Sequence, residues 1–164
     1  MTEYGIWLID NKQEAKLLRK KMAPFDFAKH SKQEIRDLLK TMREAMKNAN
    51  GVGLSANQIG LDMHVFVAQA EGKFYAIFNS KLTKVSDEKS TLEEGCLSVP
   101  NIFGEVTRPM RVVLEGYDRN GKKIKIKAWG LLARIFQHES DHLNGTVFID
   151  KAKDLHTYEL TNRE

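Results

Sequence analysis

The chain has 164 residues, of which 41% are hydrophobic and 29% are charged, with one cysteine and a net charge of +4. This length and composition predict a single globular domain over residues 1–164, in a reducing compartment such as the cytoplasm. The sequence shows no signal peptide, no apolar run of transmembrane length and no dense basic block. We therefore expect neither a membrane nor a specific nucleic acid among its partners, and we expect a monomer.

An amphipathic helix is the first predicted element. Ser31 and Glu34 have the spacing of a capping box, and apolar residues then recur at helical intervals. The pair Asn50-Gly51 is typical of a helix C-cap. A glycine-punctuated loop, GVGLSANQIG, follows at residues 51–60.

The middle of the chain is predicted to form β-hairpins, and a second helix follows. The expected strands cover residues 63–70, 74–80, 97–99, 110–118 and 122–128. The strand over residues 97–99 should be closed by Pro100. The second helix begins near Trp129 and is apolar nearly all round at its start, so it should be buried in the middle of the fold. Helix, hairpins and helix together predict an α+β domain.

The second helix carries the pattern H-E-x-x-H at His138, Glu139 and His142. Two histidines four residues apart project from one helix face and can bind one metal ion, with the carboxylate between them free for hydrolytic chemistry. Leu131 and Ile135 precede them on the same face and suggest the wall of a pocket. The alternative is a solvated helix face that binds no metal.

A catalytic metal of this kind needs a third protein ligand and one open position. The metzincin pattern is excluded, because Phe148 occupies the position of its third histidine. A downstream glutamate, as in gluzincins, would have to be Glu159 or Glu164. Cys96, in EEGCLSVPN, is the remaining candidate, since a thiolate is a good ligand for borderline or soft divalent metals.

Three blocks of the sequence resemble the peptide deformylase family, whose motifs are G-x-G-L-A-A-x-Q, E-G-C-L-S and H-E-x-D-H. They are GVGLSANQ at 51–58, EGCLS at 94–98 and HESDH at 138–142, in the family's order. The first block departs at Ser55, where the family has alanine, and Asn101 stands where many members have glycine. The resemblance extends from about residue 18 to 150.

The resemblance implies antiparallel sheets wrapped around the H-E-x-x-H helix, and an enzyme that removes the formyl group from the starting methionine of new proteins. It implies that Cys96, His138 and His142 bind one divalent metal ion, Fe(II) in cells, with Zn(II), Ni(II) or Co(II) accepted in purified protein. The other implied roles are general acid/base for Glu139, stabilisation of the reacting oxygen by Gln58 and the backbone N–H of Leu97, and backbone contacts to the substrate near Gly53 and Gly95.

The implied substrates are nascent formyl-Met peptides. Val52, Leu131 and Ile135 are candidates for the methionine slot, with plain core packing as the alternative. A transient ribosome contact would fit this role, although the short segment after His142 leaves little chain for the C-terminal helix implicated in docking in some relatives. Two rival functions are a metallopeptidase that cuts internal peptide bonds and an idle relative that only binds peptides.

Overall fold

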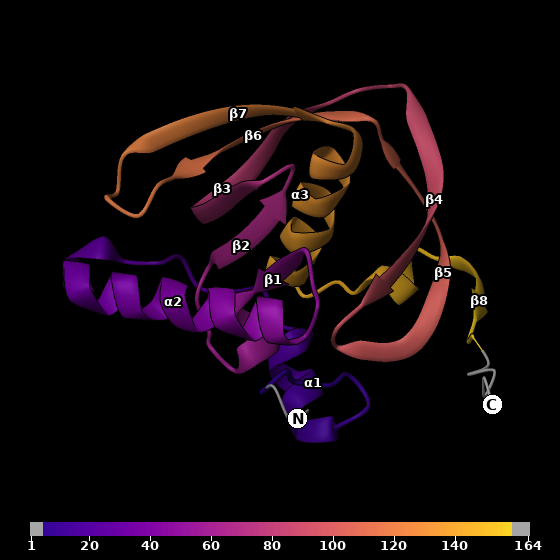
Figure 1. Ribbon diagram of the computed structural model, residues 1–164, viewed down its shortest axis with the longest axis horizontal. Helices are drawn as coiled ribbons and strands as arrows, with labels where there is room; N and C mark the ends of the chain where they lie inside the picture. Colours follow the sequence, from indigo (N-terminus) through magenta and orange to yellow (C-terminus); the bar gives the residue numbers. More distant parts are fainter. Residues whose placement is uncertain (1–4, 159–164) are drawn as a thin grey trace.

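The computed structural model describes residues 5–158, which contain three α-helices and eight strands. The strands form two antiparallel sheets (Figure 1). The α-helices are α1 (Lys12–Leu18), α2 (Lys32–Asn48) and α3 (Gly130–Leu143). The first sheet has the order β1 (Gly53–Ser55), β2 (Val65–Ala70), β3 (Lys73–Val85), β6 (Arg111–Tyr117) and β7 (Lys123–Trp129). The second has the order β4 (Lys89–Cys96), β5 (Val99–Pro109) and β8 (Lys153–His156). Short 3-10 helices are η1 (Phe27–Lys29), η2 (Ala56–Ile59) and η3 (Phe148–Asp150).

The predicted amphipathic helix is α2. The Ser31 side chain accepts a hydrogen bond from the backbone of Glu34, whose side chain accepts one from the backbone of Ser31, so the capping box is confirmed. The helix ends at Asn48, and Asn50 follows in a left-handed conformation with φ 56°. Helix α1 was not predicted; it is short, and Asn11 caps its N-terminus.

The first sheet lies between α2 and α3, and β2 shows why. Val65 and Val67 belong to the core cluster shared with α2, whereas Phe66 and Ala68 belong to the cluster shared with α3. Successive side chains of a strand point to opposite faces, so a strand covered on both sides must be apolar throughout.

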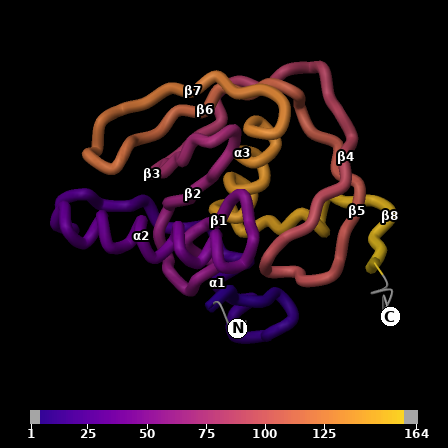
Figure 2. The backbone as a smooth tube through the Cα atoms, viewed as in Figure 1, coloured from indigo at the N-terminus to yellow at the C-terminus, as the bar shows by residue number. Residues whose placement is uncertain are grey.

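Helix α3 lies at the centre of the fold (Figure 2). It packs against all five strands of the first sheet and against β5 of the second. Most of its residues are buried, which confirms the expected central H-E-x-x-H helix enclosed by antiparallel sheets. No helix within residues 5–158 has the length and apolar content needed to cross a membrane.

The prediction of a strand over residues 97–99 closed by Pro100 was wrong. Leu97 and Ser98 form the turn between β4 and β5, Cys96 pairs with Val99, and β5 continues through Pro100. The pairing then shifts register, and Asn101 in this irregular stretch has φ 63°. Proline is tolerated where a regular ladder is interrupted. Asparagine tolerates the left-handed conformation better than most residues, which fits its presence where many members of the resembled family have glycine.

Candidate active site

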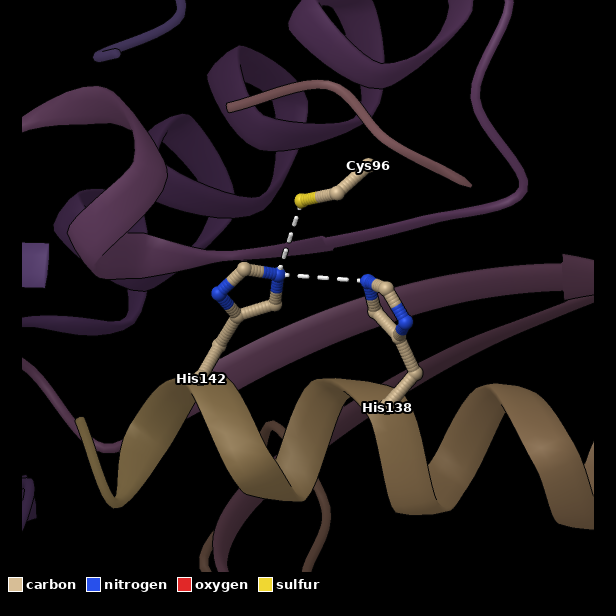
Figure 3. Close-up of side chains that lie close together, drawn as sticks. All are labelled: Cys96, His138 and His142. Atoms are coloured by element: carbon tan, nitrogen blue, oxygen red, sulfur yellow. Dashed lines mark hydrogen bonds between the residues drawn. The ribbon is translucent and has the colours of Figure 1, made fainter. Parts of the chain in front are cut away.

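Three metal-ligand side chains meet between the two sheets. Cys96 ends β4, and His138 and His142 lie one turn apart on α3. Sγ of Cys96 is 3.2 Å from Nε2 of His142, and this nitrogen is 3.2 Å from Nε2 of His138 (Figure 3). All three ligand atoms lie within 4.8 Å of one another. The structure thus brings together the three ligands that the sequence suggested.

The donor set fits a divalent metal ion. Imidazole nitrogens bind zinc at about 2.0–2.1 Å, so two of them in a tetrahedral site lie about 3.3 Å apart. The two Nε2 atoms here, 3.2 Å apart, already have this separation. Three protein ligands leave one position open, as in catalytic sites. Glu159 and Glu164, the alternative third ligands, lie outside the described residues, and Phe148 stacks against the ring of His138.

Glu94 holds His138 from the side of the ring away from the ligand cluster. Its carboxylate accepts a hydrogen bond from Nδ1 of His138 at 2.9 Å, and it is 8% exposed. Arg108 donates two further bonds at 2.6 and 2.9 Å, and Arg134 donates one at 2.6 Å. Burial alone would raise the pKa of Glu94, but the bonds from His138 and Arg108 outweigh it and hold this pKa well below its usual range. No role for this network was predicted from the sequence.

The two histidines differ in their protonation. Burial lowers the pKa of His142 well below its ordinary value, so this ring is neutral, the form that binds metals. Burial would also lower the pKa of His138, but hydrogen bonds with Cys96 and Glu94 raise it to about 10. Metal ligation therefore requires His138 to lose the proton on Nε2, the nitrogen that faces the other ligands.

The Glu139 carboxylate is packed against strand β1 and is only 3% exposed. The Ser55 hydroxyl lies 2.7 Å from its Oε2. Its Oε1 lies over Gly53, where a Cβ would come within 2.5 Å of it. Burial raises the pKa of Glu139 to about 6, although the nearby His138 and Ser55 act to lower it.

Gln58 lies beside the ligand cluster. Its Oε1 accepts a hydrogen bond from the backbone N–H of Ser55 at 3.0 Å. Its Nε2 donates to the hydroxyl of Ser98 at 3.1 Å and lies 3.6 Å from Sγ of Cys96. Both ends of the amide are therefore held, with the N–H₂ group turned toward the ligands. Leu97 occupies the adjoining turn.

A pocket of about 600 Å³ opens next to these groups. Its lining includes nearly every residue that the sequence analysis selected: Val52, Gly53, Gln58, Gly95, Cys96, Leu97, Leu131, Ile135, His138 and Glu139. Of the residues selected from the sequence, only His142 is not part of the pocket lining; it is buried. At Gly95 a Cβ would come within 2.8 Å of the Phe103 ring, so its missing side chain makes room for that ring.

The three candidates for the methionine slot sit differently in this pocket. Val52 is 50% exposed and Leu131 is 57% exposed, so core packing does not account for them. Ile135 is buried and also belongs to the core cluster around α3. The exposed apolar pair at the pocket rim therefore leaves surface available to an apolar ligand.

The buried H-E-x-x-H helix, with a cysteine sulfur beside its two histidines and a pocket next to them, is the arrangement of a metal-dependent hydrolase. Comparisons with known proteins give the particular family, since the model of the polypeptide deformylase family matches residues 8–158. A peptide deformylase of Treponema pallidum is 44% identical over 119 residues, or 73% of this chain and 74% of the relative. One from Pelotomaculum thermopropionicum is 45% identical over 123 residues, covering 75% and 79%.

Solved structures agree with this result. The crystal structure of the peptide deformylase from Thermotoga maritima superposes with a TM-score of 0.83 at 31% identity, covering 93% of this chain and 99% of that one. The chain belongs to the peptide deformylase family. It is a metal-dependent hydrolase that removes N-formyl groups from nascent peptides.

Proposed function

We propose that Cys96, His138 and His142 together bind one divalent cation, Fe(II) in the cell, and that Zn(II), Ni(II) or Co(II) can replace it in purified protein. The convergence of the three ligand atoms within 4.8 Å supports this ligand set, and the family resemblance implies Fe(II). A thiolate with two imidazoles suits all four cations. When bound, the cation supplies Lewis-acid polarisation of the formyl group and activates water at neutral pH.

Glu139 is the proton-transfer group in this proposal. It takes a proton from the attacking water and passes it to the departing amine, so that formate and a peptide with a free N-terminus are released. Its buried position beside the pocket supports the role, because a carboxyl pKa raised toward neutrality suits a group that must both accept and return a proton.

Gln58 and the backbone N–H of Leu97 are proposed to stabilise the negative charge that develops on the formyl oxygen. The amide of Gln58 is held at both ends before substrate binds, so little reorganisation is needed. One such donor typically contributes about 2.7–4 kcal/mol to transition-state stabilisation. The backbones at Gly53 and Gly95, both in the pocket lining, would flank the peptide.

Nascent formyl-Met peptides would place the methionine side chain against Val52, Leu131 and Ile135. We further propose that the chain acts as one catalytic domain and as a monomer in the cytoplasm, with at most a transient ribosome contact. An idle relative would bind formyl peptides without releasing formate, and a metallopeptidase would instead cleave unblocked peptides and casein.

Glu139→Gln and Cys96→Ala together test the assignment. The first variant should keep one metal ion per chain while turnover falls by roughly 10²–10⁴. The second should lose most of its metal, since one of three ligands is gone. Metal loss in a folded Glu139→Gln protein would mean that this carboxylate coordinates. Full metal occupancy and unchanged activity in Cys96→Ala would disprove the ligand set.

A further inference from the structure

Strand β1 presents two residues of one face to Glu139. Residues i and i+2 of a strand point to the same side, and Leu54 between them points into the core beneath α2. At Gly53 the missing side chain leaves room for Oε1 of Glu139. At Ser55 the hydroxyl lies 2.7 Å from Oε2 and 3.1 Å from the backbone oxygen of Glu139. Two features of β1 thus position the carboxylate: the missing side chain at Gly53, which leaves room for Oε1, and the hydroxyl donor of Ser55, which lies beside Oε2.

We propose that Ser55 is a positioning residue for deformylation: its hydroxyl fixes Oε2 of Glu139, so that Oε1 is held over Gly53 at the pocket wall. The proposal rests on the proton-transfer role given to Glu139 above. Ser55 stands where the family motif has alanine, and an alanine methyl could make no such bond.

The burial of both groups makes this contact matter. Ser55 is fully buried and Glu139 nearly so, which leaves little water to replace a lost partner. A carboxylate that is free to rotate about its terminal bond would point Oε1 away from the pocket for part of the time. A misplacement of about 1 Å of a reacting group can cost on the order of a hundredfold in rate.

Ser55→Ala separates the hydroxyl from the rest of the residue. The backbone N–H of Ser55, which holds Oε1 of Gln58, is kept in this variant. The matched control is Ser140→Ala on α3, next to Glu139. The Ser140 hydroxyl is also buried, but it has no hydrogen-bond partner among residues 5–158. Both variants remove one buried serine oxygen, but only Ser55→Ala removes a contact to the Glu139 carboxylate.

The measurements are kcat and KM for a formyl-Met tripeptide, metal content and melting temperature. Ser55→Ala should lower kcat about tenfold, with KM and metal content unchanged. Ser140→Ala should match the parent enzyme in all four. In a Glu139→Gln background, Ser55→Ala should cause no further loss, because Ser55 acts only through the carboxylate.

The possible results distinguish this inference from the proposed function. If Glu139→Gln lowers kcat and Ser55→Ala does not, the positioning role is wrong and the proton-transfer role stands. If Glu139→Gln leaves kcat unchanged, the proton-transfer role and the inference both fail. Metal loss in Ser55→Ala, or a fall in kcat that persists undiminished in the Glu139→Gln background, would show a merely structural role and overturn the proposal.

Discussion

The carboxylate of Glu94 accepts a hydrogen bond from Nδ1 of His138, while Nε2 of the same ring faces the ligand cluster. In the neutral ring that binds a metal, this bond fixes both the plane of the ring and the nitrogen that keeps the proton, so the lone pair of Nε2 is directed at the cation position. Arg108 and Arg134 in turn fix the carboxylate. The buried charged groups Glu94, Arg108 and Arg134 therefore set the orientation of the metal ligand His138.

Glu94→Gln should weaken metal binding by about 10–100-fold, because the acceptor that orients His138 becomes neutral. It should also lower the free energy of unfolding by about 3 kcal/mol, since the buried Arg134 loses its carboxylate partner and Arg108 keeps only Asp141. Chelator competition and urea unfolding of the metal-free protein measure the two effects.

The control is Glu93→Gln, at the neighbouring carboxylate, which is exposed and bonds His156 and Tyr158 instead. This variant should change both quantities little, because exposed ion pairs contribute at most about 1 kcal/mol. Equal losses in the two variants would contradict the special place given to Glu94.

Gly53→Ala should reduce kcat by about a hundredfold while metal content stays at one ion per chain. A Cβ at this position would come within 2.5 Å of Oε1 of Glu139, so the carboxylate must move away from the pocket wall. Steady-state kinetics and elemental analysis of the variant provide the check. Normal kcat in the alanine variant would show that the position of this oxygen is unimportant.

The pH profile should show an acid limb from Glu139. Burial raises the pKa of this carboxyl to about 6. A base must be ionised, so activity is present above this pKa and is lost as the pH falls through it. A bound cation favours the ionised form, which moves the limb to pH 6 or below. The measurement is kcat/KM between pH 4.5 and 8 at constant metal content, and a rate that rises toward pH 5 would contradict the assignment.

Oxidation should inactivate the Fe(II) form faster than the Ni(II) form. Air or peroxide can attack the iron or the Cys96 thiolate, and nickel removes the first of these targets. The half-life of activity under air, compared between the two forms of one preparation, measures the difference. Equal half-lives would mean that the iron is not the sensitive group.

Local patterns made much of the fold predictable. The capping box of Ser31 and Glu34 depends on residues three apart, and the metal-binding histidines on residues four apart, so both could be read directly from the sequence. The apolar start of the second helix indicated a buried helix; burial is observed from Ala133 onward, whereas Trp129 and Leu131 at the start itself are exposed. Assigning the third ligand, Cys96, needed the family resemblance as well, because its separation from the helix in sequence does not show whether it lies near the two histidines in the fold.

Other features depend on contacts that no local pattern encodes. Glu94 meets Arg108, 14 residues away, and Arg134, 40 residues away, only after β4, β5 and α3 have packed together. A buried acid in a run of charged residues gives no local sign of its burial. The turn at Leu97 and Ser98 was missed for a related reason: apolar neighbours suggested a strand, whereas the pairing of the two long strands decides where the chain reverses.

Discrimination between formyl and acetyl groups tests the deformylase assignment most directly. In the proposed site the acyl carbon lies between the backbones near Gly53 and Gly95, both of which line the pocket. A formyl group carries only hydrogen there, whereas the methyl of an acetyl group would meet fixed backbone and shift the attack geometry. An apolar pocket alone would discriminate by only about 1–3 kcal/mol.

The decisive measurement is kcat/KM for formyl-Met and acetyl-Met forms of one tripeptide, with the same metal bound and formate release as the readout. The formyl peptide should react at least about a thousandfold faster. Comparable values for the two peptides would contradict a site built around the formyl group.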